Sequence, residues 1–309
     1  MPLSRNSADQ QRWRQRPRAT AAEPAPPATL PTVNDSPAVS PESLINQARY
    51  PLIARSTQEQ SLRADVVSRA ATELQNDGVA ILPNFLTDSA VTTLVAEANE
   101  LRPRGHFSEV WGTPYIGLPD PDVDPRHPRA YQGRTALSAI PYDVFPITGP
   151  TRSLYEWDPL TSFVADILGV EALFRYADPL GALNVAVMDA GDELGWHFDQ
   201  TDFVVSIALQ SAESGGDFVN AARIRTHDDE RFDDVAAVLH SSLGEHDPLT
   251  QTVPMVPGTL MLFRGRHSLH RVTPIAGPTS RLVALLAYDT KPDTNSSELL
   301  KLVRYGRTA

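Results

Sequence analysis

The sequence predicts an α+β protein in which N-terminal helices support a β core formed by the second half of the chain. Between about residues 58 and 104, apolar residues recur at helical spacing. From about residue 172, the chain changes to short apolar runs separated by Gly, Pro and Asp, a pattern typical of strands joined by turns. Helices followed by many short strands indicate the α+β class, with a sandwich or barrel as the core.

Residues 1–45 are predicted to form a disordered tail, followed by one domain over residues 46–309. The stretch "ATAAEPAPPATLPTVNDSPAVSP" is rich in Ala, Pro, Ser and Thr and has few large apolar side chains. Burial therefore cannot offset the entropy lost on ordering. The first 20 residues carry five Arg and one Asp but no apolar core, which argues against a secretory signal and leaves an organelle transit peptide as an alternative.

Two helices and one strand are expected at the start of the domain. The segment "SLRADVVSRAATELQNDG" places apolar residues on one helical face and ends at Gly78, where a helix would stop. The run "VAILPNFL" follows as a strand. Thr87 or Asp88 can then cap a second amphipathic helix, "TDSAVTTLVAEANELRPR".

Residues 103–150 mix Pro, Gly, Asp and aromatic residues without a sustained period. A long stretch without such a pattern is often a functional loop, so we expect a lid or substrate loop here. A further helix, "SLYEWDPLTSFVADILG", ends at Gly169. The β core then occupies about residues 172–290, with the strand-like runs "LNVAVMDA", "DFVVSIALQ", "GDFVNAARIR", "GTLMLFRG", "HRVTPI" and "RLVALLAYD".

Composition limits the possible classes of function. The chain has 309 residues and a formal net charge of −11, which argues against nucleic acid as a partner. It contains no Cys, so disulfides and thiolate metal sites are excluded and a reducing, cytoplasmic location is expected. No apolar run reaches the roughly 18 residues that span a bilayer, so no membrane partner is expected. A small-molecule partner remains, and no protein partner can be deduced.

The stretch "GWHFDQTDF" contains the first candidate metal ligands, His197 and Asp199. In a strand or an extended loop, residues i and i+2 point to the same side. An imidazole and a carboxylate on one side form half of a chelate. Taken alone, such a pair is more often a hydrogen-bonded core histidine beside a turn aspartate.

Downstream residues complete the pattern. His270 begins the run His-Arg-Val-Thr-Pro, and Arg281 begins the next apolar run after a turn. Two His and one carboxylate form the facial triad of non-haem Fe(II) oxygenases, which leaves positions open for other ligands. If the segments at 270 and 281 form a hairpin, Arg281 lies close to His270 and can hold a dicarboxylate by a bidentate fork. His267 is the alternative third ligand, and we favour His270 because it begins a strand.

The ordered set His197-x-Asp199, His270 and Arg281 resembles the signature of the Fe(II)/2-oxoglutarate-dependent dioxygenases. The segments "PGTLMLF" and "ESGGDF" are similar to the C-terminal half of their double-stranded β-helix, a jelly-roll or cupin-like fold, and "DGVAILPNFL" is similar to their N-terminal element. The segments "LYEWDPLTSFVADILG", "GWHFDQTDFVVSIALQ", "FRGRHSLHRVTP" and "YGR" resemble the clade of free-amino-acid radical halogenases and their hydroxylase relatives. The resemblance implies Fe(II) as the metal, 2-oxoglutarate and O2 as co-substrates, and Arg281 as the 2-oxoglutarate ligand.

The chain departs from the halogenases of this superfamily at Asp199. Those enzymes carry Gly or Ala in place of the metal carboxylate, so that chloride can bind. Because Asp199 fills this position, the resemblance implies hydroxylation of a small amino acid or of an amino-acid-derived natural-product intermediate. Desaturation, ring formation and a non-catalytic β-sandwich that binds or senses a small molecule are the alternatives.

Four further residues are candidates for contact with 2-oxoglutarate or the substrate. Asn184, in the strand before His197, can contact the co-substrate or can be a surface residue of a paired strand. Tyr131 and Arg134, in the expected lid, can meet a substrate carboxylate or can be exposed. Trp196 can stack on a substrate, although packing in the core is the simpler interpretation.

Overall fold

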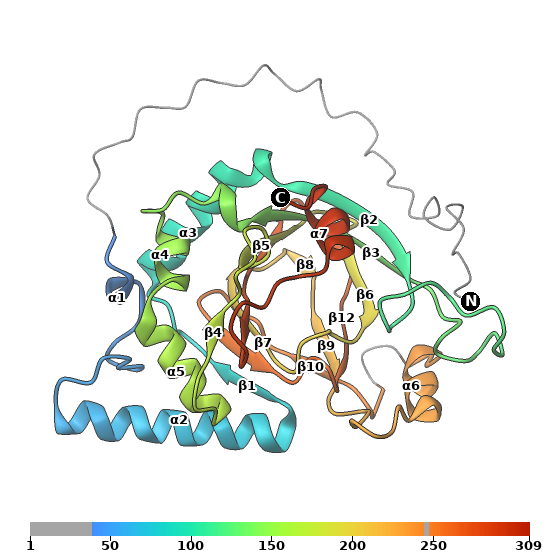
Figure 1. Cartoon of the computed structure of the whole chain (residues 1–309), viewed down its shortest axis with the longest axis horizontal. Coiled ribbons are helices and arrows are strands. Elements are labelled where there is room, and N and C mark those ends of the chain that lie inside the picture. Colours follow the sequence, from blue (N-terminus) through green and yellow to red (C-terminus); the bar gives the residue numbers. More distant parts are fainter. Residues whose placement is uncertain (1–38, 244–246) are drawn as a thin grey trace, which may run out of the picture.

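The computed structural model describes residues 39–243 and 247–309 and confirms the α+β class (Figure 1). Its helices are α1 (Pro41–Leu44), α2 (Thr57–Asp77), α3 (Asp88–Leu101), α4 (Pro150–Tyr155), α5 (Asp158–Leu168), α6 (Phe232–Leu239) and α7 (Glu298–Tyr305), with short 3-10 helices at Arg102–Arg104 and Tyr142–Val144. Its strands are β1 (Val79–Leu82), β2 (His106–Gly112), β3 (Gly133–Pro141), β4 (Phe174–Arg175), β5 (Leu183–Met188), β6 (Glu193–His197), β7 (Val204–Gln210), β8 (Ser214–Gly215), β9 (Phe218–Ala221), β10 (Gln251–Val253), β11 (Leu260–Phe263), β12 (Leu269–Val272), β13 (Ile275–Ala276), β14 (Arg281–Leu286) and β15 (Tyr288–Asp289).

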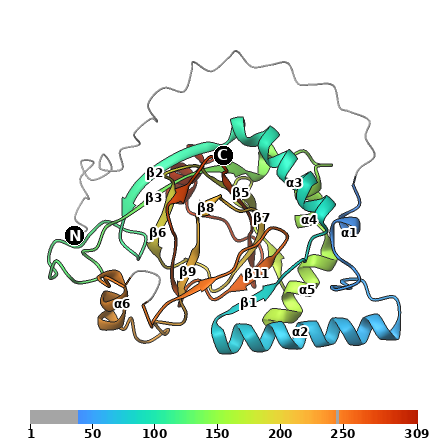
Figure 2. The ribbon, with the colours of Figure 1, turned by 180° about the vertical axis from the view of Figure 1, so that it is seen from behind.

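One sheet of eleven antiparallel strands forms the centre of the fold, in the order β1-β11-β7-β14-β5-β3-β6-β12-β9-β10 with β2 beside β3. β3 pairs with both β5 and β6, and the sheet curls there so that its two halves face each other (Figures 1 and 2). Strands β5, β7, β11 and β14 lie in the first half, and β6, β9 and β12 lie in the second. The chain thus alternates between the halves, which is the double-stranded β-helix implied by the resemblance.

The strands of the first half are buried on both faces, and their side chains alternate between these faces. In β14, Leu282 and Ala284 pack in the cluster formed with the helices, whereas Arg281, Val283 and Leu285 face the interior of the β-helix. Helices α1 to α5 cover the outer face of this half, as Figure 1 shows on the left-hand side. The predicted support of the β core by N-terminal helices is therefore confirmed.

Residues at both ends of α2 stop the helix, and of these Gly78 was predicted from the sequence. Ser56 and Glu59 form a capping box, in which each side chain accepts a hydrogen bond from the backbone amide of the other residue. Gly78 ends the helix in the left-handed conformation, with φ of +73°. Ala70 and Leu74, on the predicted apolar face, are almost fully buried.

The single helix predicted over residues 153–169 is two helices, α4 and α5, which meet at Trp157. Pro159 lies in the first turn of α5, where the amide group has no hydrogen-bond partner within the helix, so the missing hydrogen costs nothing. The same residue cannot continue a preceding helix, because its ring clashes with the turn before it. Gly169 ends α5 with φ of +67°, as predicted.

The lid expected over residues 103–150 is only partly a loop. β2 and β3 form a long antiparallel hairpin along their whole length, so the expectation is wrong for both strands and the connecting loop is limited to residues 113–132. β3 reads "GRTALSAIP" and consists mainly of small residues. It lacks the run of large β-branched and aromatic residues by which strands are identified in a sequence.

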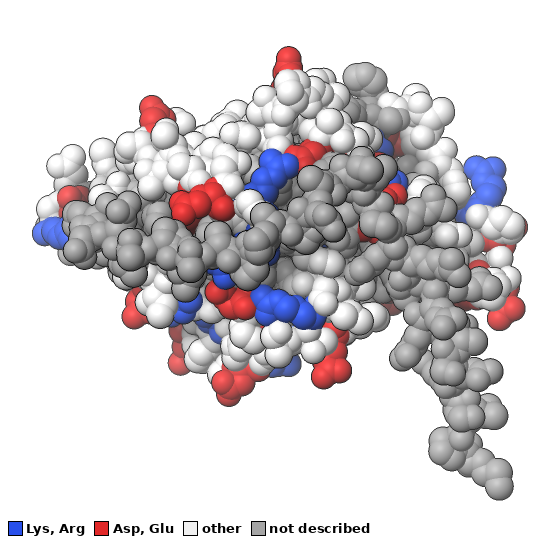
Figure 3. Space-filling model, turned by 90° about the horizontal axis from the view of Figure 1, so that it is seen from above, with Lys and Arg blue, Asp and Glu red and all other residues white. Residues whose placement is uncertain are grey.

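Acidic and basic side chains are mixed on the face of the molecule that is seen from above. In the view from above, Lys and Arg residues lie beside Asp and Glu residues (Figure 3). Among the described helices, none has both the length and the apolar composition needed to cross a membrane.

The predicted tail lies mostly outside the described residues, but its last part belongs to the domain. Leu44 and Ile45, at the end of α1, are each 2% exposed. The carbonyl of Leu44 accepts a hydrogen bond from the amide of Thr87, and Ile45 forms a β-bridge with Leu86. The folded domain therefore begins before residue 46, earlier than the sequence suggested.

Two truncations test this boundary. Removal of residues 1–38 is expected to leave stability unchanged, because their composition offers little apolar surface to bury. Removal of residues 1–45 is expected to lower the free energy of unfolding by about 3–6 kcal/mol, because each of two large buried side chains contributes about 1.5–3 kcal/mol. Denaturant unfolding of both truncated proteins and of the full chain measures the effect. Equal stability of the two truncated proteins would show that α1 does not contribute to the folded core.

Candidate metal centre

Two strands of the second half of the sheet hold the candidate metal ligands. β6 ends at His197, which lies opposite His270 of β12 in the antiparallel ladder. Cross-strand partners point to the same face, so the two imidazoles are neighbours. Asp199 follows β6 by two residues, and its backbone amide donates a hydrogen bond to the carbonyl of Gly265 (3.1 Å).

The three side chains converge. Nε2 of His197 lies 3.7 Å from Oδ1 of Asp199, and Nε2 of His270 lies 3.4 Å from Oδ2 of the same carboxylate. The centroids of the two imidazole rings are 4.1 Å apart. One candidate ligand atom from each residue lies within 4.8 Å of the others, so the structure brings together the three residues predicted from the sequence.

Hydrogen bonds fix the orientation of both imidazoles. Nδ1 of His197 donates to the carbonyl of Gly195 (2.8 Å), and Nδ1 of His270 donates to the carbonyl of Ser268 (3.0 Å). A carbonyl only accepts, so each Nδ1 carries the proton and each Nε2 keeps its lone pair directed at Asp199. Metal-binding histidines are held in the required tautomer by partners of this kind.

The site disfavours the charged forms of His197 and Asp199 when no cation is bound. Burial, together with the neighbouring His270, lowers the pKa of His197 well below its usual value, and burial raises the pKa of the Asp199 carboxyl. Oδ2 of Asp199 is buried and has no hydrogen-bond partner among the described residues. A divalent cation would use this oxygen and both imidazole lone pairs, and the donor set of two nitrogens and one carboxylate suits Fe(II).

Gly265 leaves the space that the Asp199 carboxylate occupies. A Cβ at position 265 would lie 2.1 Å from Oδ2 of Asp199. On the other side of the centre, Phe218 and Phe263 pack on the His270 ring, with centroids 5.5 and 4.9 Å away. The three candidate ligands are therefore held by close packing from two directions.

The centre opens into a pocket of about 310 Å³ inside the β-helix, a size found for small-molecule sites. Most of its wall is apolar, and includes Leu137, Ala186, Met188, Leu194, Met255, Met261, Phe263, Val272 and Val283. Among the described residues, the charged side chains in the wall are Asp199, Arg281 and Arg304. Asn184, predicted to contact the co-substrate, also lines the pocket.

The strand pairing that places Arg281 in this pocket differs from the pairing suggested by the sequence. β12 and β14 belong to the two facing halves of the sheet and form no ladder in the described structure, so the expected hairpin is wrong. Consecutive strands of a double-stranded β-helix pass to opposite halves, and Arg281 is paired with Met188 of β5 instead of His270. Both Arg281 and His270 nevertheless line the same pocket.

The surroundings of Arg281 suit an anionic ligand. The residue is 8% exposed, and its Nη1 donates a weak bond to Sδ of Met188 (3.8 Å). Burial lowers the pKa of Arg281 to about 10, so the guanidinium stays charged at neutral pH. Gly216, with φ of +72°, allows the turn after β8 to approach, because a Cβ there would lie 3.0 Å from Cδ of Arg281. A buried guanidinium can bind a carboxylate through two parallel bonds.

Arg134 and Tyr131, two of the three substrate candidates, lie outside the wall of this pocket. Arg134 pairs with Glu109 and Glu193, at 3.0 and 3.1 Å, so its charge is already balanced. Tyr131 packs against a separate apolar cluster beside the second half of the sheet and makes an edge contact with the His240 ring. Neither residue is placed to meet a substrate beside the metal centre.

Trp196, the third substrate candidate, is a core residue. It is 7% exposed and packs in the same cluster as Tyr131, with the guanidinium of Arg271 4.8 Å from its ring centroid. Adjacent residues of a strand point to opposite faces, so Trp196 points away from the side that His197 occupies. The packing interpretation of this residue agrees with the structure.

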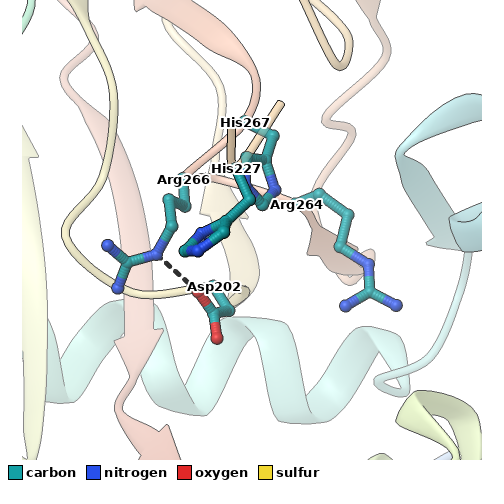
Figure 4. A pocket seen from close by; sticks show the side chains of 5 residues that line it. All are labelled: Asp202, His227, Arg264, Arg266 and His267. Atoms are coloured by element: carbon teal, nitrogen blue, oxygen red, sulfur yellow. Dashed lines mark hydrogen bonds and ion pairs between the residues drawn. The ribbon is translucent and has the colours of Figure 1, made fainter. Parts of the chain in front are cut away.

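His267, the alternative third ligand, faces a second cavity. This cavity, of about 440 Å³, is lined by Asp202, His227, Arg264, Arg266 and His267 (Figure 4). Figure 4 shows Arg266 paired with Asp202 and pointing away from Arg264, so the cationic groups do not converge on one ligand position.

Two polar residues of the interior were not predicted from the sequence. Arg304 of α7 lines the pocket, and a helical spacing with Leu300 was the signal that could have identified it. Asn220 of β9 is paired across the ladder with His270 and fully buried, and its amide has no partner among the described residues. A single Asn in a short apolar strand gives no such signal.

Comparison with solved structures identifies relatives of the fold. The chain is similar to the non-heme alpha ketoglutarate dependent epimerase SnoN from nogalamycin biosynthesis, with 16% identity, a TM-score of 0.51, and coverage of 73% of this chain and 81% of that one. A 2OG-Fe(II) oxygenase family oxidoreductase from Burkholderia pseudomallei matches with 16% identity and a TM-score of 0.47, over 73% of this chain and 91% of that one. A prolyl hydroxylase from Trichoplax adhaerens matches with 15% identity and a TM-score of 0.48, over 78% and 96%.

Comparison with sequences adds the family. No curated protein matches the chain. The family model described as Halogenase D matches residues 144–301, a span that includes His197, Asp199, His270 and Arg281. Because this match covers more than half of the chain, the protein belongs to the halogenase D family.

Proposed function

We propose that this oxygenase hydroxylates an unactivated C–H bond of a small amino acid or of a natural-product intermediate derived from one. The observation that carries the proposal is the retained carboxylate of Asp199, which lies 3.7 Å from His197 and 3.4 Å from His270. Fe(II) and 2-oxoglutarate fit the site, since a facial donor set adjoins a pocket with a buried arginine. The apolar wall accepts the hydrocarbon part of a small substrate.

In this proposal each polar residue has a distinct task. His197, Asp199 and His270 hold the metal, and Arg281 binds the distal carboxylate of 2-oxoglutarate by a charge-assisted pair. Asn184 lines the same pocket and can donate to an oxygen of the co-substrate. When bound, Fe(II) and 2-oxoglutarate together supply the activation of O2, with succinate and CO2 as products. The apolar wall excludes water, so oxidation is directed to the bound substrate.

The count of donors favours hydroxylation over chlorination. With a metal bound, the imidazoles of His197 and His270, the carboxylate of Asp199 and 2-oxoglutarate would leave a single position, which O2 would need. A halide would need the position that Asp199 takes. The carboxylate also has no other partner that could hold it away from the metal, because its Oδ2 is unpaired among the described residues.

A screen of amino acids by mass spectrometry tests the proposed reaction. The protein is incubated with Fe(II), 2-oxoglutarate and each amino acid, and succinate release is measured in parallel. Hydroxylation predicts a product with one added oxygen atom. A product that has lost two hydrogens would indicate desaturation or ring formation instead of hydroxylation. Absence of metal-dependent succinate under every condition would contradict the oxygenase assignment.

His197→Ala and Asp199→Ala are each expected to abolish succinate formation, because the loss of one ligand loosens the metal. Equilibrium dialysis with Fe(II) under nitrogen is expected to show weaker metal binding by 10- to 100-fold. His267→Ala is the matched control, since this imidazole faces the second cavity and should leave both measurements unchanged. Full activity in either ligand variant would refute the triad.

Arg281→Ala is expected to raise the apparent KM for 2-oxoglutarate by roughly 30- to 150-fold, or about 2–3 kcal/mol of lost charge-assisted bonding. Arg264→Ala, which removes an arginine of the second cavity, is the control. Succinate formation at varied 2-oxoglutarate measures the effect. An unchanged KM in Arg281→Ala would transfer this role to another basic residue.

Asp199→Gly is expected to give trace chlorinated product in high chloride, whereas the parent protein gives none. The change opens one position on the metal and removes one negative charge, so a halide can bind without excess charge. Activity should be poor, because the surrounding residues are not arranged for chloride. Mass spectrometry with the two chlorine isotopes detects the product, and chlorination by the parent would mean that Asp199 is not a metal ligand.

A further inference from the structure

One charged side chain of the pocket has no task in the proposed function. Asp199 and Arg281 are accounted for, and Arg304 is the third charged residue of the wall among those described. No carboxylate among the described residues forms an ion pair with its guanidinium. Burial lowers the pKa of Arg304, and the charges of Tyr305 and Asp199 oppose this effect. Arg304 is partly buried, and a cation that is largely withdrawn from water without a partner is costly unless a ligand supplies the opposite charge.

The helical period of α7 directs Arg304 into the pocket. Ser297, Leu300 and Arg304 are three and four residues apart, lie on one face of the helix and all line the pocket. Leu299 and Leu302 lie on the opposite face and are 57% and 50% exposed. The helix therefore directs the side chain of Arg304 toward the pocket.

The helix itself is fixed at both ends. The side chain of Ser297 caps it by accepting a hydrogen bond from the amide of Leu300, and Gly306 ends it with φ of +71°. Lys301 forms a buried ion pair with Asp178 (3.3 Å). α7 packs against β2 and β3, beside which it lies in Figure 1, and its residues Leu300 and Arg304 line the pocket. Arg304 is thus held on a rigid element at the edge of the active site.

The balance of charge identifies the kind of ligand. A divalent metal and Arg281 together neutralise Asp199 and the two carboxylates of 2-oxoglutarate, which leaves Arg304 unbalanced. We propose that Arg304 binds the carboxylate of the substrate, an inference that rests on the proposed function. One guanidinium matches one carboxylate, because its planar fork donates two parallel hydrogen bonds.

The rest of the wall limits the body of the substrate. Asp199 is the single carboxylate in the wall among the described residues, and the metal uses it. A second ammonium group on the substrate, as on a basic amino acid, would therefore have no carboxylate to pair with, and only neutral polar groups such as Asn184, Gln200 and Asn295 would be left for both ammonium groups. Met188, Met255 and Met261 offer an adaptable apolar surface instead. The substrate class is a small aliphatic carboxylic acid, including an amino acid, with an uncharged side chain.

Four small molecules of similar length test the need for a carboxylate and for an uncharged side chain separately. L-norleucine and hexanoate carry a carboxylate and an uncharged chain, L-norleucinamide lacks the carboxylate, and L-lysine adds a terminal ammonium. Their dissociation constants are measured by calorimetry under nitrogen on the full chain with Fe(II) and 2-oxoglutarate bound. We expect L-norleucine to bind at least tenfold more tightly than L-norleucinamide or L-lysine.

Variants then assign the preference to one residue. Arg304→Gln is expected to weaken binding of L-norleucine by about 10- to 100-fold and to remove its advantage over L-norleucinamide. Arg304→Lys keeps the charge and should recover part of that advantage. Arg307→Gln is the control, because Arg307 pairs with Asp143 at the surface (2.7 Å). The dissociation constant of 2-oxoglutarate should stay unchanged in all three variants.

Several results would overturn the proposal. They are equal binding of acid and amide by the parent, an equal loss for both ligands in Arg304→Gln, a matching loss of 2-oxoglutarate binding, and no binding of either carboxylate probe. The proposed function is tested separately by the slow conversion of 2-oxoglutarate to succinate without substrate. Metal-dependent succinate together with any of these results would reject the role of Arg304 alone.

Discussion

The central strands of this protein are buried on both faces, and this constraint decides how the site is built. One face of β5, β7, β11 and β14 packs under the helices, and the other lines the pocket. Alternation then places every second residue in the interior, including Asn184 and Arg281. Polar groups in such a position are costly without partners. Since the described residues supply few, the proposed metal and bound carboxylates would serve as the remaining partners.

Strands and helices with a clear period were predictable because local burial repeats with the period of the element. β14 and α2 are examples, and the capping residues Ser56 and Gly78 also act locally. β3 was not predictable, because its small side chains fit between two neighbouring strands and carry no strong propensity. The break at Pro159 was visible as a residue, but its effect depends on which turn of a helix it occupies.

The candidate metal triad was predictable because its signal is local: His197 and Asp199 lie at the end of one strand, and His270 lies near the start of another. The neighbours of Arg281 were not, because the crossing of consecutive strands to opposite halves is a property of the whole topology. Arg134 shows the opposite error. Its place in the sequence suggested a substrate contact, yet Arg134 lies outside the pocket wall and Glu109 and Glu193 already balance its charge. Such pairing cannot be deduced from a sequence.

The family model is named for a halogenase, whereas the carboxylate of Asp199 supports the proposed hydroxylation. The packing around Asp199 supports the same proposal. Gly265 approaches so closely that a Cβ there would lie 2.1 Å from Oδ2 of Asp199. The backbone of Gly265 also accepts a hydrogen bond from the amide of Asp199 (3.1 Å). The two loops therefore pack closely around the Asp199 carboxylate. A Gly at position 199 would leave this space without adding a hydrogen-bond donor for a halide, and anions are bound in proteins by such donors. The packing of the second loop thus supports the proposed hydroxylation in addition to the presence of Asp199.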